Sequence, residues 1–260
     1  MDICETTTYK SGAFDRHPWE IARARAVHSL LSDVISKGDD TTILDLGCGD
    51  VFVASFLSNK FPNSAFHCVD TAFNDEIIEQ YNKSIKGQPI YLYPSIDEYE
   101  DKTLDKINVV LLLDVIEHIE NEIEFLKELS LSKKITSETI FIITVPAFQS
   151  LFSNHDIYLN HFRRYDIKTL KERLARGNIT VEKTGYFFFS LFIIRWLQKR
   201  VQKEYDLNKE KGVGAYKSKG LLDVLLENIL YIDFRASKLL RKIGFSLPGL
   251  SCFAICRKSQ

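Results

Sequence analysis

The residues of this sequence best suited to acid–base chemistry lie between positions 155 and 165. Histidine titrates near neutrality and can take a proton from a reacting group, so His155, oriented by its neighbour Asp156, is the first candidate for a catalytic base. His161 is the second candidate. Either histidine is equally well explained as a structural group that fastens a loop.

Arginine and tyrosine side chains follow the second histidine. The candidates for substrate contact are Arg163, Arg164 and Tyr165. A guanidinium group matches the geometry of a carboxylate or a phosphate, which favours an anionic substrate. The alternative is that the arginines pair with acids of the chain itself, of which Asp156, Asp166 and Glu172 are near in sequence.

A second chemical feature is a glycine turn after an apolar run at residues 43–46. Gly47 and Gly49 let the backbone approach a ligand closely, and the helical pattern that follows points its N-terminus at the same place. The spacing differs from the G-x-G-x-x-G turn that binds pyrophosphate. Asp45 and Asp50 flank the glycines and favour a ligand with a cationic end.

The next two apolar runs add groups that fit a nucleoside. Residues 65–70 end on Asp70, about 20 residues after the turn, where an acid is placed to bind ribose hydroxyls. Residues 90–97 end in small polar side chains that could hold a base. The three runs together predict a nucleoside-containing cofactor.

These segments resemble the class I S-adenosylmethionine-dependent methyltransferases over residues 43 to about 146. In that family an acid-x-Gly-x-Gly loop holds the amino-acid part of the cofactor, and the usual third glycine is Val51 here. Residues 145–165 also resemble a bacterial subgroup with V-P-A followed by H-D-x-x-L-x-H-x-R-R-Y. The resemblance implies S-adenosylmethionine as cofactor, bound by Asp45, Gly47, Cys48, Gly49, Asp70, Thr71, Ser95, Ile96, Asp97, Leu113, Asp114, Val115 and His118.

The elements that must position these residues alternate along the chain. Apolar runs at 43–46, 65–70, 89–93, 107–113 and 139–145 alternate with helical patterns, which predicts an α/β fold with a ligand at the carboxyl ends of parallel strands. Strands near 179–186 and 251–257 would complete the Rossmann-like, doubly wound, seven-stranded and mostly parallel sheet that the resemblance implies. A helix is predicted from Pro18 to Ser36 within an N-terminal helical segment, 1–38.

A helical insertion or lid is predicted between the last two strands, at about residues 187–248. It carries twelve bases against six acids, while the whole chain has a net charge of −1. Its apolar run at 186–197 is too short to span a membrane and contains Arg195. Its basic, aromatic surface could contact an anionic membrane or cover a lipid-like substrate. The alternative is a helical lid whose apolar face packs on the sheet or on a second copy of the chain in a homodimer.

Composition and residue spacing limit the number of domains, the location of the protein and its partners. The 260 residues, of which 45% are hydrophobic, suffice for a single domain spanning 1–260. Five cysteines without a C-x-x-C pair predict reduced thiols, and the absence of a secretion signal predicts a cytoplasmic location, peripheral at the inner face of the membrane if the insertion binds lipid. We expect no metal site, since the two histidines of the 155–161 segment lack helical ligand spacing. The chain lacks a broad basic face outside the insertion, so no nucleic-acid partner is expected.

The sequence therefore predicts an S-adenosylmethionine-dependent methyltransferase acting on a small or lipid-like, anionic acceptor, with oxygen favoured as the acceptor atom. Methyl transfer from a sulfonium is an in-line displacement, so the protein must align two atoms and manage one proton. The alternative is a non-catalytic scaffold with the same fold, for which Val51 is the hint.

Overall fold

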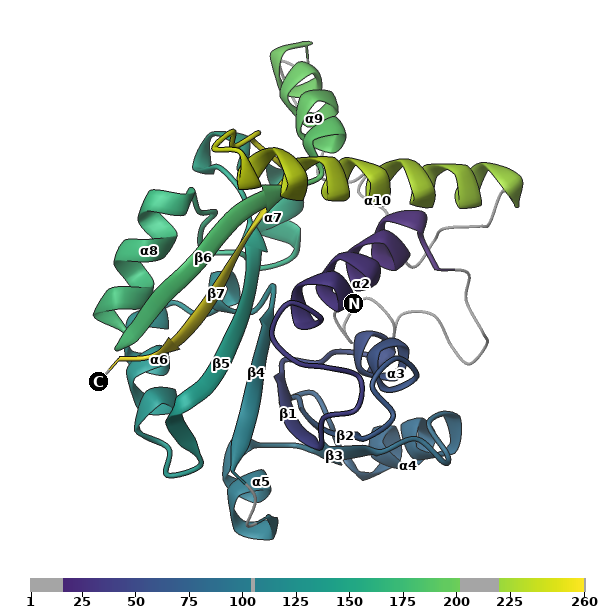
Figure 1. Ribbon diagram of the computed structural model, residues 1–260, viewed down its shortest axis with the longest axis vertical. Helices are drawn as coiled ribbons and strands as arrows, with labels where there is room; N and C mark the ends of the chain where they lie inside the picture. Colours follow the sequence, from purple (N-terminus) through teal and green to yellow (C-terminus); the bar gives the residue numbers. More distant parts are fainter. Residues whose placement is uncertain (1–15, 104–105, 202–219, 260) are drawn as a thin grey trace.

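The computed structural model describes residues 16–103, 106–201 and 220–259. A seven-stranded sheet runs through the molecule in the order β3-β2-β1-β4-β5-β7-β6 (Figure 1). Strand β7 is antiparallel to both of its neighbours, and the other pairings are parallel. This is the doubly wound, mostly parallel sheet that the sequence predicts. Its strands are β1 (Thr41–Leu46), β2 (Ser64–Val69), β3 (Ile90–Tyr93), β4 (Ile107–Leu113), β5 (Ile135–Pro146), β6 (Ile179–Phe187) and β7 (Ser251–Lys258).

Helices cover both faces of the sheet. One core lies under α2 (Pro18–Leu31), α3 (Phe52–Ser58), α4 (Asp75–Ser84) and α10 (Leu221–Lys242). The other lies under α5 (Ile96–Lys102), α6 (Glu122–Leu131) and α8 (Ile167–Arg176). Both cores consist of apolar side chains from opposite faces of the same strands, as expected for a parallel sheet covered on both sides.

The N-terminal helix is shorter than predicted. Its start is fixed by Pro18 in the first turn and by a capping box between His17 and Glu20. It ends at Leu31 instead of Ser36, because the N–H groups of Asp33 and Val34 bond to the carbonyls three residues back, at 3.1 and 3.0 Å, and the chain then turns. Residues 1–15 of the predicted N-terminal segment lie outside the described residues.

The predicted insertion is helical where it is described, with α9 (Phe189–Val201) and α10 between β6 and β7. Asp233 of α10 accepts hydrogen bonds from the backbone N–H groups of Phe189 and Ser190, at 3.2 and 2.7 Å, and thereby caps α9. Residues 202–219 of the insertion lie outside the described residues. Within the described part of the chain, every helix is too short or too polar to cross a membrane.

The cysteines behave as small core residues. The four that the structure describes are buried and free: Cys48, Cys68, Cys252 and Cys256. Cys4 lies outside the described residues.

Candidate active site

The order of the strands along the sheet reverses between β1 and β4, which pair in parallel, and the predicted cofactor residues lie at or just after the carboxyl ends of β1, β2, β3 and β4. Gly47 follows β1 with φ +69°, and a Cβ atom at this position would lie 2.8 Å from Cγ2 of Val115. No side chain therefore fits there, and the backbone can approach a ligand only because the residue is glycine.

Asp70 links the ends of β1 and β2. Its Oδ2 accepts a hydrogen bond from the N–H of Gly49 at 2.9 Å, and its Oδ1 accepts one from Ala72 at 3.0 Å. Each carboxylate oxygen has more than one acceptor site, so these bonds leave capacity for a ligand hydroxyl. Asp70 both holds the glycine turn and presents acceptors beside it.

Asp45 is buried at the end of β1, with 1% of its surface exposed. Neither carboxylate oxygen has a hydrogen-bond partner in the described part of the chain. Burial raises the pKa of this carboxyl to about 7, with Asp70 adding to the rise and Arg23 opposing it. A buried acid without a partner is costly, and a cationic group beside it would stabilise its ionised form.

Asp114 follows β4 in a left-handed conformation, with φ 57°. Its Oδ1 accepts a hydrogen bond from the hydroxyl of Thr144 at 2.8 Å, and its Oδ2 lies 2.9 Å from a guanidinium nitrogen of Arg23 on α2. The sequence analysis missed Arg23 because nothing in its apolar helix distinguishes it. The N-terminal helix is thereby tied to the strand ends that carry the site.

The remaining predicted cofactor positions lie at the same edge of the sheet. Ser95 follows β3 and caps α5, since its side chain accepts a hydrogen bond from the N–H of Glu98 at 3.2 Å. Ile96 and Asp97 form the first turn of that helix. The end of β3 is joined to the end of β2 by a hydrogen bond from the N–H of Asp70 to the carbonyl of Tyr93.

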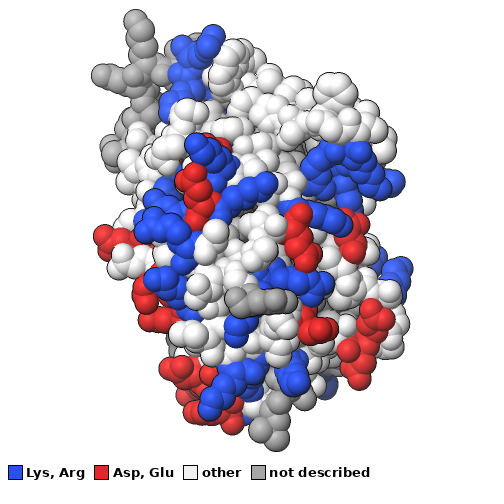
Figure 2. Space-filling view, turned by 60° about the vertical axis from the view of Figure 1, so that its left-hand side comes forward, with Lys and Arg blue, Asp and Glu red and all other residues white. Residues whose placement is uncertain are grey.

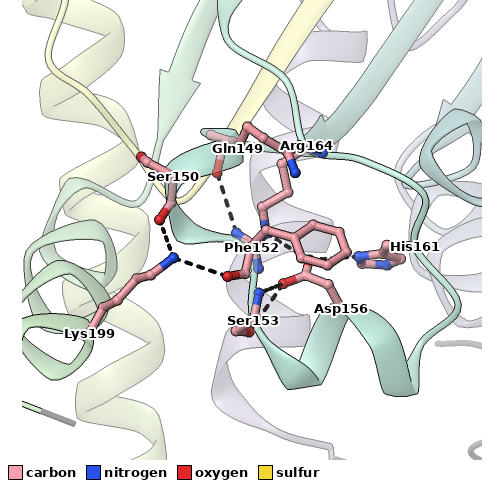
Figure 3. A network of polar contacts seen from close by, with 9 residues as sticks. Gln149, Ser150, Phe152, Ser153, Asp156, His161, Arg164 and Lys199 are labelled. Atoms are coloured by element: carbon pink, nitrogen blue, oxygen red, sulfur yellow. Dashed lines mark hydrogen bonds and ion pairs between the residues drawn. The ribbon is translucent and has the colours of Figure 1, made fainter. Parts of the chain in front are cut away.

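Asp156, on the short helix α7 (Asn154–Tyr158), is completely buried and joins three parts of the loop after β5 (Figure 3). Its Oδ1 lies 2.9 Å from Nδ1 of His161 and 2.6 Å from Nε of Arg164, and its Oδ2 accepts a hydrogen bond from Ser153. Burial raises the pKa of this carboxyl, but the hydrogen bonds from His161 and Arg164 outweigh burial and hold it well below its ordinary value. The ionised acid fixes the proton of His161 on Nδ1 and leaves Nε2 as an acceptor.

Because Asp156 contacts His161, His161 becomes the first candidate for the catalytic base and His155 the second. Asp156 is directed at His161, the second candidate of the sequence analysis, rather than at His155, its neighbour on α7. His161 also contacts His118, whose ring lies edge-on to it with the ring centroids 4.6 Å apart. The structure thus brings together a catalytic candidate from the loop after β5 and a cofactor candidate from the segment after β4.

His118 does not share a helical face with Asp114. The two residues are four positions apart, a spacing that places side chains on one face of a helix, but Asp114 lies before η1 (Ile116–His118), a single 3₁₀ turn. The left-handed backbone at Asp114 interrupts any helix between the two residues. Their side chains are therefore placed by separate elements.

One cluster in the described part of the chain has the donor set of a metal site. Glu117, His118 and His161 each offer one ligand atom, and these atoms all lie within 4.8 Å of one another. Glu117 is completely buried with neither carboxylate oxygen hydrogen-bonded to the described residues, and burial raises its pKa well above its usual range, with Asp114 adding to the rise. A carboxylate with two imidazoles suits zinc, although the sequence predicts no metal. Nε2 of His161 can ligate a metal or accept a proton, but it cannot do both.

The three predicted substrate residues all have partners within the protein. Arg163 forms an ion pair with Glu122 and donates to the carbonyls of Ile119 and Glu120. Arg164 pairs with Asp156, which is one of the alternatives that the sequence left open. Tyr165 is buried, and its hydroxyl donates to the carbonyl of Ile116 at 3.3 Å. These contacts fasten the loop to the segment after β4.

Comparisons with known proteins give relatives for part of the sequence. No family model matches the sequence. A stretch of 107 residues, 40% of the chain, is 36% identical to the ubiquinone biosynthesis O-methyltransferase of Rickettsia bellii and covers 42% of it. A stretch of 110 residues is 30% identical to a probable (S)-tetrahydroprotoberberine N-methyltransferase 2 of Papaver bracteatum and covers 29% of it. The chain matches less than half of the length of these curated relatives.

Solved structures share the fold over most of the chain. A putative sarcosine dimethylglycine methyltransferase from Galdieria sulphuraria superposes with a TM-score of 0.55 at 12% identity, covering 91% of this chain and 85% of that one. The plantazolicin methyltransferase BpumL, solved in complex with SAH, gives 0.53 at 17% identity, covering 94% of this chain and 85% of that one. The chain therefore has the fold of the S-adenosylmethionine-dependent methyltransferases and is similar to named methyltransferases over 40% of its sequence, which confirms the family resemblance and the fold that it implies.

Proposed function

We propose that this chain, as one domain over residues 1–260, transfers a methyl group from S-adenosylmethionine to a small acceptor. The observation that carries the proposal is Asp45, a buried carboxylate without a partner among the described residues, beside a glycine turn at the switch point of the sheet. The cationic amino-acid end of the cofactor would supply the charge that Asp45 lacks. The relatives named above for O- and N-methyl transfer support the same reaction.

The cofactor would extend from β1 toward β3 along the strand ends. Asp45, Gly47, Cys48 and Gly49 would hold its amino-acid part, while Asp70 and Thr71 would bind the ribose hydroxyls. Ser95, Ile96 and Asp97 would surround the base, since the first turn of α5 follows the strand next to Asp70. The segment after β4, with Leu113, Asp114, Val115 and His118, would lie along the cofactor.

The chemical step needs alignment and one proton acceptor. S-adenosylmethionine supplies an electrophilic methyl carbon on a sulfonium. An acceptor hydroxyl would form the new C–O bond as the C–S bond breaks with its electron pair going to sulfur, and Nε2 of His161 would take the hydroxyl proton. Asp156 stabilises the imidazolium that results, because it is ionised and bound to Nδ1.

The acceptor that we propose is small or lipid-like, with oxygen as the methylated atom. The His161–Asp156 pair supports oxygen, because a hydroxyl must lose a proton during transfer, and it would serve a nitrogen or carbon acceptor in the same way. The prediction of an anionic acceptor depends on Arg163 and Arg164. Both arginines form ion pairs inside the protein, with Glu122 and Asp156, and these pairs leave fewer N–H groups to bind a substrate. The arginines therefore contribute to substrate binding mainly by holding the loop in place.

A non-catalytic scaffold is the second candidate function. Val51 favours it, because this residue occupies the place of the family's third glycine and has a left-handed backbone, with φ 56°, that suits glycine. Incubation with methyl-labelled S-adenosylmethionine and a panel of phenols, carboxylates and amphipathic quinols separates the two functions. Labelled product that disappears in His161→Ala supports the enzyme, whereas cofactor binding without transfer to any acceptor supports the scaffold.

A further inference from the structure

The longest helix of the described chain, α10, has one face packed on the protein. Leu230 and Phe234 are buried in the core beside α2. Arg25 of α2 pairs with Glu227 at 2.7 Å, and Lys238 reaches Asp33 at 2.8 Å. These contacts fix the rotation of α10 about its own axis, so that its opposite face is directed away from the protein.

The opposite face of α10 is apolar and exposed over the whole length of the helix. Leu221 is 88% exposed and Ile232 is 64% exposed, values typical of side chains without neighbours. Leu239, in the last turn, and Ile243 and Phe245, after the helix, are also exposed. The face consists of Leu221, Leu222, Val224, Leu225, Leu226, Ile229, Ile232, Leu239, Ile243 and Phe245. A continuous patch of this kind marks an interaction surface.

The charges of α10 are divided between its two faces. All three of its acids are partly buried: Glu227 pairs with Arg25, Asp233 caps α9, and Asp223 lies in the first turn. Arg235 and Lys242 lie among the exposed residues, and no acid does. In Figure 2 the top of the molecule is mostly white and blue, and most of the red side chains lie lower.

Helix α9 extends this surface toward the candidate site. Ile194, Trp196 and Leu197 are exposed, and the guanidinium of Arg200 lies 3.9 Å from the ring centroid of Trp196. Lys199 donates to the carbonyls of Ser150 and Phe152, in the loop that carries Asp156 and His161 (Figure 3). These hydrogen bonds join α9, which carries part of the apolar surface, to the loop of the candidate site.

We propose that the exposed face of α10, with the end of α9, lies on the surface of an anionic phospholipid bilayer. Apolar side chains would enter the acyl boundary, while Arg235, Lys242 and Arg200 would meet the phosphate headgroups. A second copy of the chain fits this face less well, because α10 has no exposed acid that could pair with Arg235 and Lys242 across a two-fold contact.

This inference does not require methyl transfer, and its test is a binding measurement. The full-length protein is floated with vesicles of phosphatidylcholine alone and with vesicles that also contain phosphatidylglycerol. We expect flotation with the anionic vesicles only, weakened by salt. Protein that stays in the dense fraction with both kinds of vesicle overturns the proposal.

Two pairs of variants locate the contact. Ile232→Asp/Leu239→Asp should lower vesicle affinity by about tenfold or more, whereas Leu131→Asp, at a residue on α6 that is 73% exposed, should leave it unchanged. Arg235→Gln/Lys242→Gln should weaken flotation, and the matched charge control Lys83→Gln/Lys86→Gln should not. Circular dichroism confirms that each variant is folded. Equal flotation of the α10 variants and their controls, or a stable dimer that the α10 substitutions dissociate, contradicts the membrane assignment.

Discussion

The Nδ1 atom of His161 lies 2.9 Å from Oδ1 of Asp156, so the acid of the loop after β5 orients a histidine five residues further on. The same oxygen accepts a hydrogen bond from Nε of Arg164, which keeps the acid ionised. An ionised carboxylate on Nδ1 gives the imidazole the tautomer in which Nε2 accepts a proton. His161 is therefore the general base of our mechanism.

Replacing His161 by alanine should lower kcat by about 10²- to 10⁴-fold, because general-base assistance is lost. Cofactor affinity should stay within a few-fold of wild type, since His161 acts on the acceptor. The measurement is steady-state methyl transfer combined with calorimetric titration of S-adenosylhomocysteine. His155→Ala is the matched control, and a larger loss of kcat in that variant would return the role of base to His155.

Chelation distinguishes the two uses of Nε2 of His161. If this nitrogen accepts the proton, turnover should be unchanged after dialysis against EDTA. Activity that disappears with EDTA and returns with zinc or another divalent cation would instead make Glu117, His118 and His161 metal ligands. Elemental analysis of the purified protein provides the independent readout.

Cofactor affinity should rise with pH up to about 7. The pKa of Asp45 is about 7 in the ligand-free fold, against an ordinary value of 3.8, so the fold favours the protonated acid. This contribution to stability is full below pH 4 and is lost as the pH rises through 7. A bound cation favours the ionised acid, so binding near pH 6 should release a proton. Titration in buffers of different ionisation enthalpy measures that proton, and its persistence in Asp45→Asn would exclude Asp45 as the source.

At position 51 we expect glycine to give a more stable protein than alanine, which is the reverse of the order usual elsewhere in a folded chain. Val51 is buried with φ 56°, and any residue with a Cβ is strained in this conformation. Both substitutions lose the packing of the side chain, but only glycine relieves the strain. We expect Val51→Gly to exceed Val51→Ala by about 1 kcal/mol in the free energy of unfolding. Urea unfolding checks this, and a more stable alanine variant would show that the position is unstrained.

The sequence predicted the sheet and the cofactor edge well, because both depend on local patterns. Each strand was placed within a few residues, apart from the earlier start of β5 at Ile135, and the acids do lie at the ends of adjacent strands, Asp45 in β1 and Asp70 directly after β2. The contacts of the loop after β5 were harder to predict. Glu122 of α6 pairs with Arg163, in the loop between α7 and α8, and with Arg173 of α8, and no local pattern connects it to either arginine. Which histidine Asp156 orients also depends on how the loop folds back, and this is decided by tertiary packing.

The central claim is that the edge around Asp45, Gly47, Gly49 and Asp70 binds S-adenosylmethionine. Calorimetric titration of the folded protein with S-adenosylmethionine and with S-adenosylhomocysteine tests it most directly. Our account predicts binding of both at one site per chain, strongly weakened in Asp70→Ala because that change removes the ribose acceptor and releases the N–H of Gly49. A folded wild-type protein that binds neither compound would contradict the account.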